Sequence, residues 1–129
     1  MIEITIESRE KRLPKKLLTE VLDDALAAHL PKGKKERKTL VALRLLDGAE
    51  IARLNHEFHH RDGETDVLAF PIEEEDEDGV YLLGDVAVNA ALAGREAKAR
   101  GISMREELAL YALHGTLHLL GFRDHSQRE

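Results

Sequence analysis

The sequence predicts a single α+β domain in which a four-stranded sheet carries packed helices. One observation is the order of the apolar patterns, which runs strand, helix, strand, helix, strand, strand, helix, helix. Another is size and composition. A chain of 129 residues with 43% hydrophobic and 34% charged side chains suits one domain, residues 1–129, around one core. The last helix is apolar around its circumference, so we expect it to be buried.

The amino-terminal third predicts a strand, a helix and a second strand. Isoleucines alternate with polar residues over positions 2–6, as in a half-buried strand. Pro14 suits the first turn of a helix, whose leucine-rich stripe should end at Pro31. His29, near the end of that helix, is interpreted as structural. Residues 39–46 are apolar around one arginine and predict the second strand.

The middle of the chain predicts a helix, a polar loop and a short strand. Asp47 and Glu50 have the spacing of a capping box, so a helix should begin there. Its apolar residues, as far as Phe58, are expected to face the core. A polar loop follows, and Asp66 is interpreted as a cap at the entry of a strand. That strand should stop at Pro71, because proline cannot donate to a strand ladder.

The last third predicts one more strand and two helices. Residues 81–88 form the fourth strand pattern. Asn89 can cap a helix that ends before Gly101. Ser103 and Glu106 have the spacing of a second capping box, which would open the final helix.

The final helix carries two histidines, in the stretch HGTLHLLGFRDH of residues 114–125. His114 and His118 should lie on one helix face, because four residues make about one turn. Two imidazoles with this spacing can hold one metal ion. Gly121 can end the helix and let the chain fold back, so His125 could supply a third ligand. Three protein ligands with one open position are typical of a catalytic zinc site.

Other interpretations of these histidines stay open. Paired histidines on an apolar helix often pack in the core without binding a metal. Zinc peptidases place a glutamate general base directly after the first histidine, but Gly115 stands there, which disfavours peptide hydrolysis. Asp124, beside His125, could orient a ligand imidazole or could be a turn residue.

Three blocks of the sequence resemble the YbeY family, metal-dependent endoribonucleases of bacterial rRNA maturation. HGTLHLLGFRDH (114–125) resembles the family pattern HGxLHLxGYDH, LNHEFHHRDGETDVLAFP (54–71) resembles LNxxYRxKDxPTDVLSFP, and LGDVAVN (83–89) resembles LGDIVIS. The blocks occur in the family's order. The resemblance implies a zinc-dependent endoribonuclease, specific for single strands, that matures the 3′ end of 16S rRNA and works with the ribosome or its small subunit.

The resemblance also implies site residues. It assigns the metal, Zn²⁺, to His114, His118 and His125. Zinc held by neutral imidazoles keeps its full charge, which lowers the pKa of bound water toward about 7. The family has an arginine where this chain has His59, and a lysine where it has Arg61. We expect these two residues to supply catalytic charge or acid–base groups.

The spacing between the second and third histidines is one residue longer than in the family pattern. Counting from His118 with the family's spacing reaches Asp124 rather than His125. Two histidines with one carboxylate are therefore an alternative to three histidines, and zinc accepts both sets. We expect His125 to be the ligand, because a loop opened by Gly121 absorbs an extra residue at little cost.

The net charge of −6 conceals an uneven distribution. Residues 73–78, which we expect to form a loop, carry six acidic side chains, so the rest of the chain is neutral. Residues 32–38 hold five basic side chains and one acidic one. Further basic residues follow at Arg95, Lys98, Arg100 and Arg105. A basic face for RNA could therefore coexist with an acidic loop.

The remaining composition predicts a cytoplasmic protein without a membrane partner. The chain has no cysteine, which suits a reducing compartment, and no apolar run long enough to cross a membrane. Two functional alternatives to the endoribonuclease remain. One is a metallopeptidase-like hydrolase, and the other is a non-catalytic ribosome assembly factor whose metal is structural.

Overall fold

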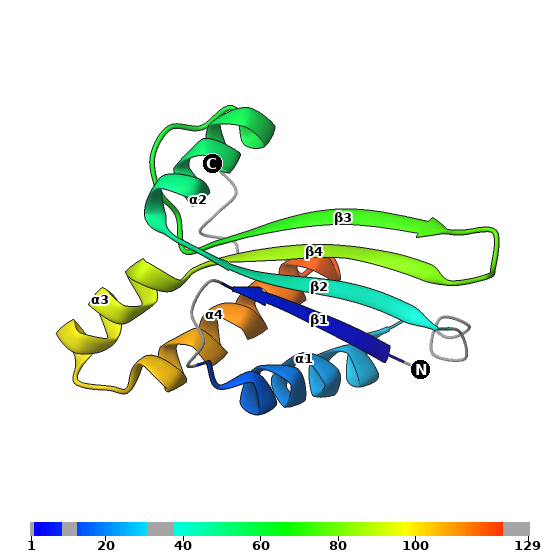
Figure 1. The fold of residues 1–129 in the computed structure, drawn as a ribbon, viewed down its shortest axis with the longest axis horizontal. Coiled ribbons are helices and arrows are strands. Elements are labelled where there is room, and N and C mark those ends of the chain that lie inside the picture. The colour runs from blue at the N-terminus through cyan, green and yellow to red at the C-terminus, as the bar shows by residue number, and fades with distance from the viewer. Residues whose placement is uncertain (1, 9–12, 31–37, 123–129) are drawn as a thin grey trace.

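The computed structural model describes residues 2–8, 13–30 and 38–122 (Figure 1). Its elements follow the predicted order, and the α+β class and the four-stranded sheet are confirmed. They are β1 (Ile2–Ser8), α1 (Lys15–His29), β2 (Thr39–Leu46), α2 (Gly48–His59), β3 (Val67–Glu75), β4 (Tyr81–Asn89), α3 (Ala90–Arg100) and α4 (Met104–Leu119). The expected helix stop at Pro31 lies outside the described residues. None of the described helices combines the length and apolar composition that crossing a bilayer requires.

The sheet is mixed, with the strand order β1-β2-β4-β3. β1, β2 and β4 run parallel, whereas β3 runs antiparallel to β4. β1 and β3 are therefore the edge strands. The carboxyl ends of the three parallel strands lie at the same end of the sheet, and α2 and α3 begin there directly after β2 and β4.

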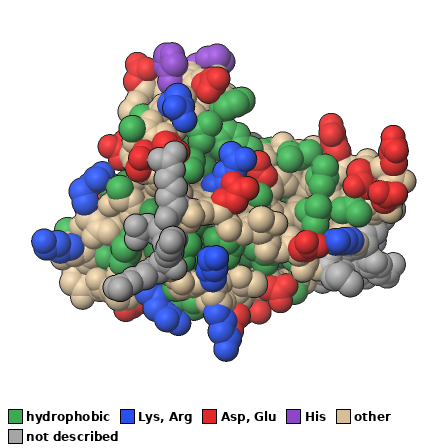
Figure 2. Space-filling view, viewed as in Figure 1, with side chains coloured by type: hydrophobic (Ala, Val, Ile, Leu, Met, Phe, Trp, Pro, Cys, Tyr) green, Lys and Arg blue, Asp and Glu red, His purple; other side chains and the backbone are tan. Residues whose placement is uncertain are grey.

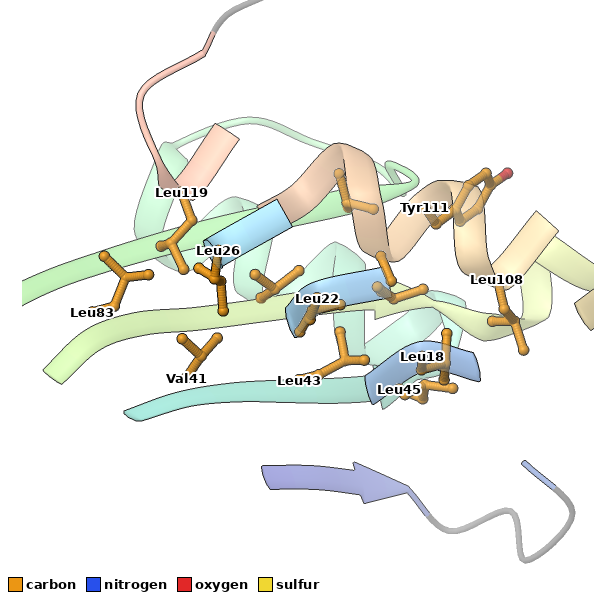
Figure 3. Close-up of a cluster of buried hydrophobic side chains, with 14 of the residues drawn as sticks. Leu18, Leu22, Leu26, Val41, Leu43, Leu45, Leu83, Leu108, Tyr111 and Leu119 are labelled. Carbon is orange, nitrogen blue, oxygen red and sulfur yellow. The ribbon is translucent and has the colours of Figure 1, made fainter. Parts of the chain in front are cut away.

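Helices α1 and α4 cover one face of the sheet and enclose the main core (Figures 1 and 3). The stripe of α1 consists of Leu18, Leu22 and Leu26, each at most 1% exposed. Burying a leucine side chain contributes roughly 1.5–3 kcal/mol, so this stripe fixes the helix on the sheet. The sheet and α4 supply the facing residues, which include Val41, Leu43, Leu45, Leu83, Val86, Leu108 and Leu119.

Helix α2 packs on the other face of the sheet, near one end (Figure 1). Ile51 forms a small second core with Leu68 and Ala87. Val67, by contrast, belongs to the main core. Successive residues of β3 therefore serve opposite faces, as the alternation of a strand requires.

The predicted helix caps are largely confirmed. Asp47 Oδ1 accepts a hydrogen bond from the Glu50 N–H at 2.8 Å, and the Glu50 carboxylate accepts one from the Asp47 N–H at 3.2 Å. Asn89 caps α3 as expected. Ser103 accepts from the Glu106 N–H, but the Glu106 carboxylate bonds the Ser103 hydroxyl rather than its backbone N–H. The second capping box is therefore only half formed.

Strand β3 continues past Pro71, where the sequence predicted its end. It reaches Glu75, so the acidic stretch begins inside the strand and only its later residues form the loop. Pairing with β4 is irregular between Pro71 and Glu74, and Glu73 has a φ of 52°. Proline is tolerated because β3 is an edge strand with one side free of partners. Figure 2 shows the acidic side chains gathered at the far end of this hairpin.

Helix α4 is buried along one face only, which corrects the prediction of a helix buried all round. Leu108 and Ala112 are at most 2% exposed, whereas Leu110 is 51% exposed. The contacts of α4 come from α1, α3, β3 and β4. These neighbours cover its inner side, whereas Leu110 lies on the side that remains exposed. Burial therefore does not explain why this exposed side of α4 is apolar.

Helix α4 lies tightly against the sheet at Gly115. A Cβ atom placed there would lie 2.4 Å from Val86 Cγ1 and 3.5 Å from Val67 Cβ. Carbon atoms in contact need about 3.5–4.0 Å, so position 115 has no room for a side chain. Nearby, Leu119 packs over Gly84, where a Cβ would lie 2.7 Å from the leucine Cδ1. Two glycines thus set the distance between α4 and the sheet.

We predict that Gly115→Ala destabilises the protein by about 1–3 kcal/mol, because the added methyl group overpacks the contact with Val86. Denaturant unfolding measures the change. Gly94→Ala in α3 is the matched control, since its Cβ would meet nothing closer than 3.8 Å. This control should stabilise the protein by roughly 0.5–1 kcal/mol, the usual gain for alanine in a helix.

A double-mutant cycle identifies the contact responsible. In a Val86→Ala background, the cost of Gly115→Ala should fall, because the clashing Cγ1 atom is gone. An equal cost in both backgrounds would show that α4 does not depend on this approach.

Candidate metal centre

His114 and His118 lie together near the end of α4. Their ring centroids are 4.3 Å apart, with an interplanar angle of 86°. Both side chains are half-buried, so each is partly covered by its neighbours and partly accessible to solvent. The structure therefore brings the two imidazoles together, as their spacing predicts. That they bind a metal remains a prediction.

The third expected ligand, His125, lies outside the described residues, as does its alternative, Asp124. Within residues 2–8, 13–30 and 38–122, no group of three or more His, Cys, Asp or Glu side chains is arranged to hold a metal ion. The described part of the candidate centre is the imidazole pair, whose nitrogen donors suit zinc. A set of three ligands requires a donor from outside this part of the chain.

Asp66 faces the histidine pair from the entry of β3. One carboxylate oxygen, Oδ1, accepts the Val67 N–H at 2.8 Å and the Thr65 hydroxyl at 3.3 Å, which confirms its predicted capping role. The other oxygen, Oδ2, lies 3.7 Å from His114 Nδ1. A carboxylate this close to Nδ1 can orient the imidazole and leaves Nε2 as the ring nitrogen available to a metal ion. Sequence reasoning missed this proximity, because no spacing connects two residues so far apart in the chain.

Asn89 holds the segment that presents Asp66. This side chain is fully buried, and its Nδ2 donates to Glu64 Oε1 at 2.9 Å and to the Thr65 carbonyl at 3.1 Å. Its backbone N–H donates to the Asp66 carbonyl at 2.8 Å. Its Oδ1 meanwhile caps α3. One buried amide thus joins β4, α3 and the segment before β3, which fixes the position of Asp66 relative to α4.

Glu64 completes this network at the surface. Its carboxylate accepts from Asn89 and also pairs with Arg95 Nη2 at 3.2 Å. The hydrogen bond from Asn89, followed by that from Arg95, holds the pKa of Glu64 below its ordinary value. The segment is therefore anchored by a charged acceptor as well as by a buried amide.

His59 and Arg61, the expected catalytic residues, lie at the end of α2. The His59 imidazole stacks on Phe70, with centroids 5.5 Å apart and planes at 29°. Phe58 meets the same ring edge-on and is 59% exposed, so the expectation that it faces the core is wrong. The Arg61 N–H donates to the Asn55 carbonyl at 3.3 Å. Figure 2 shows histidine side chains gathered over this end of α2.

The structure does not place His59 on the α4 side of the sheet. Phe70, on which His59 stacks, borders the small core under α2. Val67, on the same strand, belongs to the core under α4. The His59 ring and helix α4 therefore contact opposite faces of β3. A catalytic role for His59 and Arg61 stays a prediction.

The packing at Gly115 also bears on whether this site could carry the glutamate base of a zinc peptidase. A zinc peptidase needs a glutamate directly after the first histidine. Here a side chain at that position would collide with Val86. The carboxylate base of peptide hydrolysis is therefore excluded from this position by packing.

Comparison with protein families shows a match over almost the whole chain. The model of a family described as Endoribonuclease YbeY matches residues 3–129. Among individual relatives, "Endoribonuclease YbeY" of Persephonella marina is 34% identical over 129 residues, which is 99% of this chain and 80% of the relative. The protein of the same name from Carboxydothermus hydrogenoformans is 39% identical, over 80% of this chain and 70% of the relative.

Other comparisons agree, although the coverage varies. "Endoribonuclease YbeY" of Synechococcus sp. (strain JA-2-3B'a(2-13)) is 45% identical over 92 residues, and the match spans only 56% of that relative. The chain therefore spans a little over half the length of this relative. The solution structure of TM1509 from Thermotoga maritima superposes with a TM-score of 0.57 at 28% identity, covering 99% of this chain and 77% of that protein.

We predict that the hydrogen-bonded carboxylate of Glu64 makes the stability of the protein depend on pH. Because its pKa is lowered from 4.5 in the folded state, its contribution is present above that value and is lost as the pH falls through the lowered pKa. The free energy of unfolding of the wild type should therefore exceed that of Glu64→Gln by more at about pH 6 than at about pH 3.

Denaturant unfolding at both pH values tests this prediction. Glu57→Gln is the control, since it removes the same charge from the exposed surface of α2. A difference between wild type and Glu64→Gln that is the same at both pH values would contradict the network.

Proposed function

Because the chain belongs to the YbeY endoribonuclease family, we propose that it is a metal-dependent endoribonuclease that cleaves single-stranded RNA. The observation that carries the proposal is the family match over residues 3–129, together with the imidazole pair on α4. We propose further that it matures the 3′ end of 16S rRNA in the cytoplasm, in contact with the small ribosomal subunit.

The proposed metal is one Zn²⁺ ion, held by His114, His118 and His125. The donor chemistry fits, since imidazole nitrogens are common ligands of catalytic zinc. When bound, zinc supplies a Lewis acid that stabilises negative charge on oxygen. Asp66 is proposed to orient His114 through Nδ1, from which its Oδ2 lies 3.7 Å away. Gly115 contributes by letting α4 lie against β4, which holds the histidine helix in place.

His59 and Arg61 are proposed to act on the RNA from the end of α2. Both are exposed, so a phosphate or a ribose can reach them. Arg61 offers a permanent positive charge, which stabilises the charge that develops on a phosphodiester during cleavage. His59 offers an imidazole, a side chain that can act as a general acid or base. RNA is favoured over peptide as the substrate, because packing excludes a glutamate at position 115.

A cleavage assay tests the proposal. Purified protein is incubated with single-stranded RNA that contains the 3′ end of 16S rRNA, with and without a chelator, and then with added zinc. We expect cleavage that the chelator abolishes and zinc restores. His114→Ala and His118→Ala should lose both cleavage and bound metal, as measured by elemental analysis. His56→Ala is the control, since this exposed histidine pairs with Asp62 rather than with α4.

The same assay separates the third-ligand alternatives. His125→Ala should lose most of the metal affinity, whereas Asp124→Asn should lose roughly 10–100-fold, as expected for a residue that orients a ligand. Full metal occupancy in all three histidine variants would contradict the proposed centre. Metal-dependent cleavage of casein with intact RNA would favour a peptidase. Binding to ribosomal subunits without any cleavage would favour an assembly factor.

A further inference from the structure

A pocket of about 450 Å³ opens beside His114, between α3 and α4. It is bordered by Asp66 at the entry of β3, and by side chains of both helices. Pockets that bind small organic groups are typically of about 300–1,000 Å³, so this one is large enough for a single nucleotide unit. Its position places any bound group directly next to the candidate metal centre.

The wall formed by α4 is apolar. Leu110, Leu113 and Leu117 follow one another at the spacing of a helix face and all line the pocket. Leu110 is 51% exposed, which leaves apolar surface in water. The Tyr111 ring adds an aromatic surface, and Figure 3 shows its hydroxyl pointing out of the hydrophobic core. A flat apolar ring would cover this wall, which accounts for the leucines on the outer side of α4.

The rest of the pocket lining is mostly polar, with more acidic than basic side chains. Glu107, only 2% exposed, pairs with Arg100, and Glu96 and Asp66 lie on the same pocket. Burial and the nearby carboxylates, Glu107 first among them, raise the pKa of Tyr111 to about 12, so its phenol keeps its proton. Three carboxylates and one guanidinium therefore line the pocket. The pocket therefore repels phosphate and favours an uncharged ring with N–H donors.

We propose that this pocket binds a nucleobase of the RNA whose backbone lies at the His114–His118 pair, and that it prefers bases with an exocyclic amino group. Glu96 is the exposed acceptor for that amino group, as carboxylates accept from the N4 amino group of cytosine. Uracil has a carbonyl oxygen in place of the amino group, so it cannot donate a hydrogen bond to the Glu96 carboxylate. The inference rests on the proposed function, because it takes RNA to be the substrate.

Titration with cytidine and uridine tests the pocket without a metal and without cleavage. The two nucleosides have the same size and differ in the group that the carboxylate should read. Leucine methyl resonances in NMR spectra of the whole protein report binding. We expect the Leu110 and Leu117 methyl groups to shift, and cytidine to bind on the order of 3–10-fold more tightly than uridine, the worth of one hydrogen bond.

Variants separate the two parts of the pocket. Glu96→Gln should remove most of the preference for cytidine, since its amide also offers donors to uridine. Leu110→Ser should weaken the binding of both nucleosides. Ile72→Ser is the matched control, since Ile72 is 42% exposed on β3 and does not line this pocket. Equal binding of cytidine and uridine, or shifts confined to leucines elsewhere, would overturn the inference.

Cleavage of matched RNAs distinguishes failure of this inference from failure of the proposed function. RNAs with cytidine or uridine at each position around the cleaved bond are compared. Cleavage without any base preference would overturn the pocket and leave the endoribonuclease in place. Selective nucleoside binding without cleavage of any RNA would support the pocket and contradict the endoribonuclease.

Discussion

Helix α4 lies so close to the sheet that position 115 has no room for a side chain, and the rest of the site depends on this contact. Val86 fills the space where a Cβ would stand, and Leu119 packs into the space left by Gly84. Interiors packed at this density transmit small displacements rather than absorb them. The distance between α4 and the sheet therefore fixes the positions of His114 and His118. The two side chains lie together and are both half-buried.

The second constraint is the buried side-chain amide of Asn89. It ties the 64–66 segment to β4 and to the start of α3. Asp66 is thereby held beside an imidazole that a different element supplies. The proposed site needs both parts, because α4 supplies the imidazoles and the 64–66 segment supplies the carboxylate beside one of them. The proposed metal centre therefore lies where α4 passes the entry of β3.

Local patterns predicted most of the fold. Alternation over positions 2–6, the leucine stripe of α1 and the Asp47–Glu50 box identified their elements, because each depends on neighbours in the chain. Pro71 misled the prediction, since its tolerance depends on β3 being an edge strand, which only the strand order reveals. The approach of Asp66 to His114 is likewise non-local. Helical periodicity also could not show that the outer leucines of α4 line a pocket rather than a core.

The most direct test of the metal centre is the X-ray absorption spectrum of the zinc-loaded protein at the zinc edge. Shells of imidazole nitrogen have a recognisable multiple-scattering pattern, so the spectrum counts histidine ligands without requiring RNA or activity. A centre of three imidazoles predicts zinc–nitrogen distances of about 2.0–2.1 Å. A spectrum of zinc surrounded by oxygen, without imidazole scattering, would contradict a centre built on His114 and His118.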